Sequence, residues 1–199
     1  MLPNRGDEQV MPHVDLLAPA IQCEETRRSI TPGVAKLLAE VDAACDRSTE
    51  AMRHRIIAAL ARAVVQPDLL SMDQRALQTG CYARHLMYDD PAGRFAIVSI
   101  VWGPDQFSPP HAHHTWCAYA VHENELQETL YAWDDEIRSA RPVLARTRAP
   151  GYISFADAGL DQIHRLGNSG SEPAISLHVY GIDGARVGTQ VNNLIDVAV

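Results

Sequence analysis

The sequence predicts a mostly β protein, a small barrel of the jelly-roll type, with two or three helices before it. Residues 32–66 are rich in helix formers, whereas from about residue 78 short β-branched and aromatic segments alternate with turn formers. Several such segments at close spacing are typical of an antiparallel sandwich or barrel. The 199 residues, 46% of them hydrophobic, suffice for one well-filled core. We therefore expect an N-terminal arm over 1–30 and one domain over 31–199, its barrel spanning about 78–190.

The first helix is expected to begin at Pro32, because proline costs little in a first helical turn and "GVAKLLAEVDAAC" is rich in helix formers. The second helix is expected to start from a cap at Ser48 or Thr49, to run through "EAMRHRIIAALARAVV" and to end before Pro67. Its apolar residues recur at helical spacing and predict one buried stripe of Met52, Ile56, Leu60 and Val64. We interpret both helices as a cap on a core formed elsewhere.

Six segments predict the strands of the barrel. In chain order they are "RFAIVSIVWG", "TWCAYAVH", "LQETLYAW", "GYISFA", "IHRLG" and "AISLHVYG". The turn residues of "GYISFADAG" are expected to bring the chain back across the barrel.

Net charge, cysteine spacing and apolar content argue against several classes of protein. The formal net charge is −8 and no lysine-rich run occurs, which argues against a general nucleic-acid binder. The four cysteines have no CxxC pair, which suits reduced thiols in the cytosol. No apolar run approaches the ~18 residues of a membrane span, and the N-terminus does not read as a secretory signal. We expect a cytoplasmic protein that handles small molecules without membrane or nucleic acid, in an oligomeric state that the sequence leaves open.

The stretch "PHAHHTWC" at 110–117 carries the first chemical signal. His111 and His113 are separated by one residue, so on an extended strand both imidazoles point to the same face and can bind one metal ion. Two polar residues on a solvated face would give the same pattern. A third ligand is offered by His164 in "DQIHRLGN", and His178 in "SLHVYG" is the other candidate.

The order of an HxH pair, a hairpin, a glycine-led strand and a lone histidine resembles the cupin pattern. Cupins usually carry a carboxylate four or five residues after the second histidine, where this chain has Cys117 and Ala118. A neutral face of three histidines would hold Fe(2+) with three open positions, and a thiolate substrate could replace the missing anionic ligand.

Two longer stretches, "YARHLMYDDPAGRFAIVSIVWGPDQFSPPHAHHTW" and "IHRLGNSGSEPAISLHVYG", resemble the thiol dioxygenase family of cysteine dioxygenase and 3-mercaptopropionate dioxygenase. The likeness covers about residues 82–184. It implies a small cupin barrel that adds O2 to a thiolate sulfur at non-haem Fe(2+), giving a sulfinic acid. It also implies His111, His113 and His164 as the iron ligands.

The resemblance assigns a Ser-x-His-x-Tyr relay to Ser176, His178 and Tyr180, and strand alternation puts these three on one face. In such a chain Tyr180 would donate to oxygen or substrate while His178 holds it in place. A polar barrel lining without chemistry is the alternative.

Arg84 falls where cysteine dioxygenases have arginine, so it would bind a substrate carboxylate, with Tyr82 sharing that task. A surface arginine on an edge strand is the plainer alternative.

Cys117 lies near the cysteine that joins the active-site tyrosine in a thioether in animal cysteine dioxygenases, so a Cys117–Tyr180 crosslink is a hypothesis. A small apolar residue inside a barrel is the other reading of this cysteine. The family's first motif is usually His-Asp-His, and Ala112 replaces its carboxylate. His85 and His114 are additions that would bind a second carboxylate or face solvent. The hairpin "HENELQETLY" replaces the usual glycine-containing turn.

The leading hypothesis is an Fe(2+) thiol dioxygenase acting with O2 on L-cysteine first, then on mercaptosuccinate or 3-mercaptopropionate. A non-catalytic cupin that binds metal or a small acid would keep the HxH pair but would not need the relay of Ser176, His178 and Tyr180. A cupin isomerase or hydrolase with another metal is the third candidate, and nickel or cobalt would also accept imidazoles.

Overall fold

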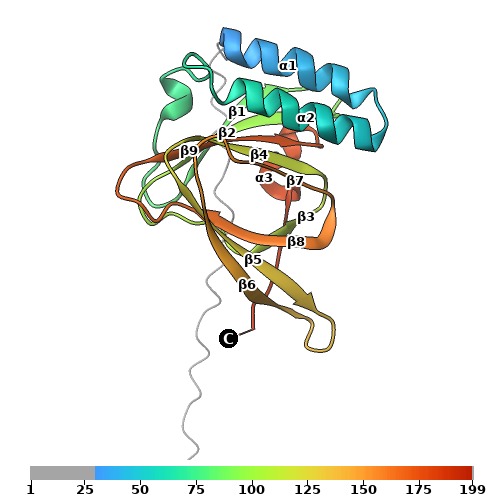
Figure 1. Ribbon diagram of the computed structural model, residues 1–199, viewed down its shortest axis with the longest axis vertical. Helices are drawn as coiled ribbons and strands as arrows, with labels where there is room; N and C mark the ends of the chain where they lie inside the picture. The colour runs from blue at the N-terminus through green and yellow to red at the C-terminus, as the bar shows by residue number, and fades with distance from the viewer. Residues whose placement is uncertain (1–29, 199) are drawn as a thin grey trace, which may run out of the picture.

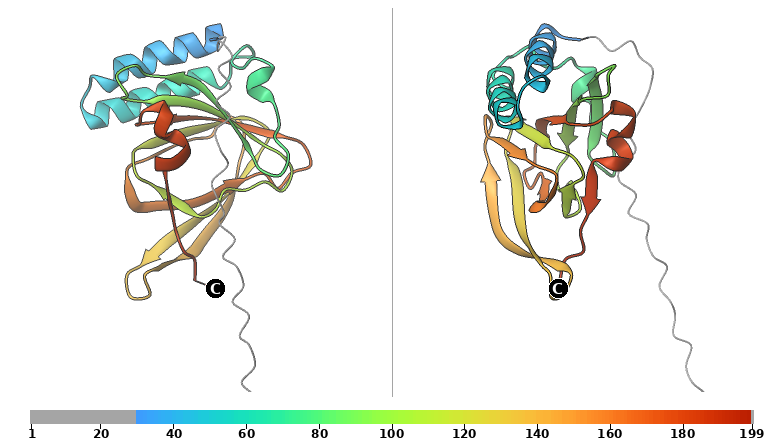
Figure 2. Two further views of the ribbon diagram at one scale, coloured as in Figure 1. Left: turned by 180° about the vertical axis from the view of Figure 1, so that it is seen from behind. Right: turned by 90° about the vertical axis from the view of Figure 1, so that its right-hand side faces the viewer.

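The computed structural model describes residues 30–198, so nearly all of the expected N-terminal arm lies outside the described residues. Two five-stranded antiparallel sheets face one another, and helices α1 and α2 lie across the outer face of the first sheet (Figures 1 and 2). The predicted mostly β fold with helices ahead of the barrel is confirmed. The helices are α1 (Pro32–Cys45), α2 (Thr49–Ala63) and α3 (Val187–Gln190), with short 3-10 turns at Asp73–Arg75 and Gly184–Arg186.

The first sheet has the strand order β1-β2-β9-β4-β7 and the second has β10-β3-β8-β5-β6. The strands are β1 (Ala83–Asp89), β2 (Ala96–Trp102), β3 (His111–His113), β4 (Cys117–Glu123), β5 (Leu126–Asp134), β6 (Ser139–Arg148), β7 (Ile153–Ala156), β8 (Gly159–Gly167), β9 (Ala174–Tyr180) and β10 (Asn192–Leu194). All six predicted strand segments are present. Four further strands lie outside these six segments: β3, which holds the histidine pair expected on an extended strand, and β1, β6 and β10.

Helices α1 and α2 begin where the sequence predicts. The Thr31 hydroxyl accepts a hydrogen bond from the Val34 amide at 3.2 Å and so caps α1. Ser48 stands at the N-cap of α2 but makes no capping bond through its side chain. Ile56 and Leu60 of the predicted stripe are fully buried, which confirms that this face of α2 covers a core.

Strand β9 has no solvent-facing side, and this places the polar residues of the barrel. Leu177 and Val179 belong to the apolar cluster beneath α1 and α2. The alternate residues Ser176, His178 and Tyr180 point the other way, into the space between the two sheets, and are also buried. The strand therefore divides one core from the other, and its polar face can line a site only inside the barrel.

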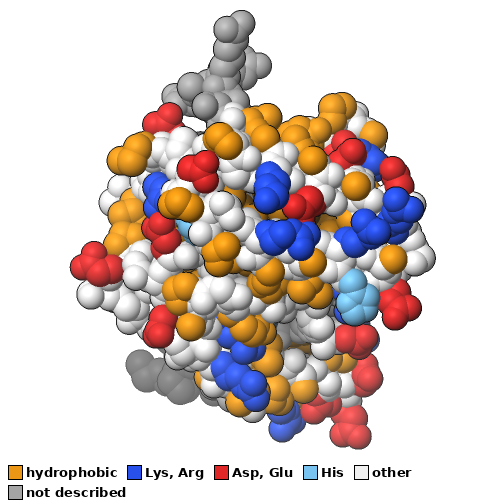
Figure 3. All heavy atoms as spheres, turned by 45° about the horizontal axis from the view of Figure 1, so that its top comes forward, with side chains coloured by type: hydrophobic (Ala, Val, Ile, Leu, Met, Phe, Trp, Pro, Cys, Tyr) orange, Lys and Arg blue, Asp and Glu red, His pale blue; other side chains and the backbone are white. Residues whose placement is uncertain are grey.

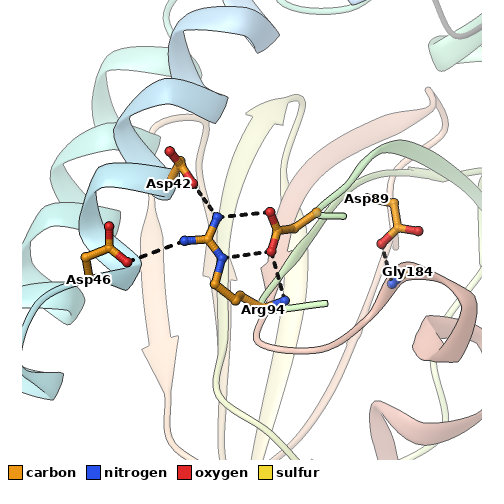
Figure 4. A network of polar contacts seen from close by, with 6 residues as sticks. Asp42, Asp46, Asp89, Arg94 and Gly184 are labelled. Atoms are coloured by element: carbon orange, nitrogen blue, oxygen red, sulfur yellow. Dashed lines mark hydrogen bonds and ion pairs between the residues drawn. The ribbon is translucent and has the colours of Figure 1, made fainter. Parts of the chain in front are cut away.

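An ion-pair network fixes α1 to the turn between β1 and β2 (Figure 4). Arg94 donates from Nε to Asp90 at 2.8 Å and also pairs with Asp42 on α1 and, at 3.5 Å, with Asp46 directly after α1. The Arg94 guanidinium holds the pKa of Asp90 below its ordinary value. Beside this network, the Asp89 carboxylate accepts a hydrogen bond from the Gly184 amide at 2.7 Å, which ties the segment after β9 to the end of β1.

The surface around the helices carries charges of both signs. In Figure 3, Lys and Arg side chains lie beside Asp and Glu side chains, with apolar side chains scattered between them. None of the helices in the described part of the chain is long and apolar enough to cross a membrane.

Candidate active site

Three buried histidines meet inside the barrel. His111 and His113 come from β3 and His164 from the adjacent strand β8, where it is the register partner of His111. The ring centroids lie 4.7 to 5.2 Å apart, and one ligand atom from each residue lies within 4.8 Å of the others. The spacing of the HxH pair and the lone histidine therefore predicts their convergence correctly.

The hydrogen bonds of these rings leave nitrogens free for a metal. The His111 Nδ1–H donates to the Pro109 carbonyl at 2.9 Å, and the His164 Nδ1–H donates to the Glu128 carboxylate at 2.7 Å. When such a ring is neutral and carries its proton on Nδ1, Nε2 is an unprotonated acceptor. Burial lowers the pKa of His111 and of His113 well below the ordinary value, so both are neutral. Imidazole nitrogens that converge in this way suit a divalent transition metal.

Glu128 is the carboxylate that sequence reasoning missed. It lies on β5, is 3% exposed, and also accepts from Arg148 Nε at 2.7 Å. Burial alone would raise the pKa of Glu128, but hydrogen bonds from His164 and Arg148 outweigh it and the pKa lies below its ordinary value. The sequence indicates this residue in one way: Glu128 is a charged residue between Leu126 and Leu130 on the face of a predicted strand that points inward.

The relay predicted on β9 is continuous, and Trp102 extends it. The indole Nε1–H of Trp102 donates to Ser176 Oγ at 2.8 Å, Ser176 Oγ lies 2.8 Å from His178 Nε2, and His178 Nδ1 lies 3.1 Å from the Tyr180 hydroxyl. Because Ser176 accepts from Trp102, its own proton is free to donate to His178 Nε2. Burial lowers the pKa of His178 well below its ordinary value, so the ring is neutral. With Ser176 as the donor to Nε2, the ring would carry its proton on Nδ1 and donate to Tyr180.

Arg84 is buried, which excludes the alternative of a surface arginine. It is 6% exposed, its Nη2 donates to the Tyr82 hydroxyl at 3.1 Å, and its Nε is buried without a partner among the described residues. Burial raises the pKa of the Tyr82 hydroxyl, so this group stays protonated. A buried guanidinium with an unpaired donor is complementary to an anion.

Arg84 lines a small cavity of about 20 Å³, enough for about one water molecule. Its polar walls combine the predicted groups with two new ones, namely Tyr82, Arg84, Ser108, His111, His113, His164, His178, Tyr180 and Asn192. Asn192 comes from β10, opposite His113. No carboxylate lines this cavity among the described residues.

A larger cavity of about 370 Å³ also adjoins the histidines. It shares His113, Cys117 and His164 with the small one. Its further walls come from β4 to β8 and include Tyr119, Glu128, Arg148, Tyr152 and Ser154. Two of the three histidines, His113 and His164, therefore line both the small cavity with Arg84 and the larger one with Arg148.

Of the three remaining candidate residues, Cys117 lies at the site, whereas His85 and His114 do not. Cys117 is buried opposite Tyr180 in the β4–β9 pairing, and burial raises the pKa of its thiol. His85 Nε2 lies 2.8 Å from the Ala76 carbonyl, and His114 is exposed. Neither of these two histidines lines either cavity, so a role in binding a second carboxylate finds no support.

Fold and site together define a small cupin-type β-barrel with a buried three-histidine metal-binding group. The family model described as "Cysteine dioxygenase type I" matches residues 72–183, more than half of the chain. The chain therefore belongs to the cysteine dioxygenase type I family.

Similar proteins include cysteine dioxygenase type 1 of Homo sapiens, 32% identical over 105 residues, and that of Danio rerio, 31% identical over 103 residues. The chain spans about half the length of these curated relatives, and the matches cover 50% of the chain itself. Among solved structures, a protein with a double-stranded β-helix domain from Klebsiella pneumoniae is 20% identical with a TM-score of 0.45, covering 60% of this chain and 88% of that one. An oxalate oxidase in complex with glycolate is 17% identical with a TM-score of 0.43, covering 57% and 59%.

Proposed function

We propose that the protein is an Fe(2+)-dependent thiol dioxygenase that oxidises a small carboxylated thiol, L-cysteine first, to its sulfinic acid. The reaction is RSH + O2 → RSO2H, in which both oxygen atoms end on sulfur. The observation that carries the proposal is the presence, around one small cavity, of the three histidines, of Arg84 with an Nε that has no partner among the described residues, and of the tyrosine end of a hydrogen-bonded relay.

His111, His113 and His164 would hold the metal. The pKa directions of His111 and His113 and the Nδ1 hydrogen bonds of His111 and His164 support this role, because a ligand imidazole must be neutral and oriented. A bound ferrous ion would supply redox chemistry with O2 and a binding position for the thiolate.

Arg84 would bind the substrate carboxylate. Its guanidinium can offer Nε and a terminal N–H in parallel, the geometry that matches a carboxylate with two hydrogen bonds. Tyr82 would keep the Arg84 side chain in place through the 3.1 Å hydrogen bond to Nη2. Because Arg84 and Tyr82 are buried, solvent would compete little for these bonds, and the carboxylate would fix where the sulfur lies.

Tyr180 would act as a hydrogen-bond donor toward the cavity. With His178 Nδ1–H directed at its oxygen, the Tyr180 proton is left to point into the cavity that it lines. Burial raises the pKa of Tyr180 well above its ordinary value, which keeps that proton on the oxygen. Ser176 and His178 would position Tyr180, and the Trp102 indole would fix the direction of the chain.

The register pairing of Cys117 with Tyr180 across β4 and β9 supports the proposed thioether. Forming it would break the Cys117 S–H bond and a ring C–H bond next to the Tyr180 hydroxyl, form S–C, and pass two electrons and two protons to O2. We expect a joined peptide, lighter by two hydrogens than its parts, in digests of iron-loaded protein turned over with substrate. Its absence from wild type, with a Tyr180 that reacts as in Cys117→Ala, would contradict the crosslink.

Mercaptosuccinate and 3-mercaptopropionate stay alternative substrates, and the 370 Å³ cavity that adjoins the histidines gives room for a thiol bulkier than cysteine. A non-catalytic metal-binding protein is disfavoured by the relay, for which it has no use.

The cysteines Cys45, Cys81 and Cys117 are free. Free thiols suit a reducing compartment, so we place the protein in the cytoplasm with a thiol and O2 as its partners.

The deciding experiment is oxygen uptake by iron-loaded protein with L-cysteine, 3-mercaptopropionate, mercaptosuccinate and cysteamine in parallel. Uptake confined to the carboxylated thiols would support the reaction and Arg84 as the anchor, and the best of them would name the substrate. Uptake with cysteamine at the same rate would contradict the carboxylate argument. Bound iron without uptake of oxygen by any thiol would favour the metal-binding alternative.

A further inference from the structure

We infer that Glu128 and Arg148 form a positioning pair for His164, which sets the orientation and the basicity of that one metal ligand. The inference rests on the proposed metal site, but it concerns residues outside the expected ligand set and relay. Both side chains are mostly buried, with 3% of the Glu128 side chain and 11% of the Arg148 side chain exposed.

The three residues come from three neighbouring strands, β8, β5 and β6, on the inward face of one sheet. Glu128 pairs in register with Leu166, two residues from His164, and Leu126 pairs with Arg148. His164 and Arg148 are therefore the diagonal neighbours of Glu128, at a separation that long side chains bridge. Strand pairing alone brings them together, since they are far apart in the sequence.

The two oxygens of Glu128 have separate tasks. Oε1 accepts from His164 Nδ1 at 2.7 Å, and Oε2 accepts from Arg148 Nε at 2.7 Å and lies 2.7 Å from Arg148 Nη2 in an ion pair. The first bond fixes the His164 tautomer that leaves Nε2 free, and an ionised acceptor makes that nitrogen a stronger donor to a metal. The second bond holds the charge, because a buried carboxylate without a cation would lose its stabilisation.

The other two histidines have different supports. His111 is held by a backbone carbonyl, and the His113 Nδ1 has no partner among the described residues. Disturbing the pair should therefore weaken one ligand and leave the set otherwise intact. Arg148 also stacks on Tyr152, with its guanidinium carbon 4.0 Å from the ring centroid, so its side chain is fixed from a second side.

The test measures metal affinity in the absence of thiol and O2. Anaerobic Fe(2+) binding is followed by competition with a chelator, and Co(2+) absorption reports the ligand field, for wild type, Glu128→Gln, Arg148→Gln and Arg148→Lys. We expect Glu128→Gln to lower affinity roughly 10- to 100-fold and to shift the Co(2+) spectrum, as is usual when the outer partner of a metal-bound histidine is lost. Arg148→Gln should follow in the same direction, and Arg148→Lys should restore most of the affinity because it keeps the charge.

Glu123→Gln is the matched control. It removes the carboxylate of another partly buried ion pair, with Arg75 at 2.5 Å, in a position that lines neither cavity. We expect wild-type metal affinity and an unchanged Co(2+) spectrum for this variant, with thermal unfolding recorded for all variants.

Wild-type affinity in Glu128→Gln, or an equal loss in Glu123→Gln, would overturn the inference. Wild type that binds metal in this way but oxidises no thiol would remove the proposed activity and leave the pair's role standing. Wild type that binds no divalent metal would remove both.

Discussion

Replacing Arg84 by methionine is the sharpest test of how the small cavity selects its substrate. Methionine has a similar length and no charge, so the 94% buried position keeps an apolar body while the anion partner disappears. Two charge-assisted hydrogen bonds to a carboxylate, at about 1.5–3 kcal/mol each, would be lost together. With a factor of ten for each 1.4 kcal/mol, kcat/KM for 3-mercaptopropionate should fall roughly 10²- to 10⁴-fold.

The assay is oxygen uptake normalised to bound iron, with 3-mercaptopropionate compared against a thiol that has no carboxylate, such as cysteamine. The residual rate with cysteamine should change little, because that thiol makes no use of the guanidinium. Tyr82→Phe removes one neutral hydrogen bond to Arg84, and its cost should stay within about tenfold. Equal losses for both thiols in Arg84→Met, or no loss for 3-mercaptopropionate, would refute the role of Arg84 as carboxylate anchor.

Three further outcomes follow from other contacts. The pKa of Asp90 in the folded protein lies below its ordinary value of about 3.9. The ionised carboxylate therefore stabilises the folded state fully above about pH 4, and this contribution is lost as the pH falls through the lower folded pKa. The free energy of unfolding in urea should show this loss in wild type and not in Asp90→Asn. Gly181→Ala places a Cβ 2.1 Å from Trp116 Nε1 and should cost about 1–3 kcal/mol in urea unfolding, and an unchanged midpoint would contradict that clash. Asn192→Asp puts a negative charge into the cavity of Arg84 and should raise KM for 3-mercaptopropionate more than for cysteamine, whereas equal changes would mean that residue 192 does not face the substrate.

The sequence predicts the parts of the fold and site that depend on local periodicity. Alternation alone puts His111 beside His113 and aligns Ser176, His178 and Tyr180, since side chains two residues apart share a strand face. The first residues of α1 and α2 and the apolar stripe of α2 also depend only on local sequence. These features need no knowledge of which strand pairs with which.

What the sequence does not predict depends on pairing between strands. Glu128 is recognisable as a partner of His164 only when β5 lies beside β8, and Asn192 reaches the cavity only because a three-residue strand pairs with β3. The sequence does not predict strand β6, because most of its residues are exposed and it contains Pro142 and several arginines. It therefore lacks the apolar alternation of a strand that is covered on one face. The carboxylate expected to be lost with Ala112 has a counterpart in Glu128, which no local motif encodes.

The doubly buried strand β9 has a consequence for how the protein folds correctly. A slip of one residue in its pairing would turn Leu177 and Val179 into the polar cavity and drive His178 beneath the helices, because side chains on a strand change face at every step. Both errors would be penalised at once, by apolar surface lost from the helical side and by a polar ring stranded in a dry core. Residues of helices α1 and α2 line neither cavity. Their apolar packing against Leu177 and Val179 nevertheless favours the one register of β9 that directs His178 into the barrel.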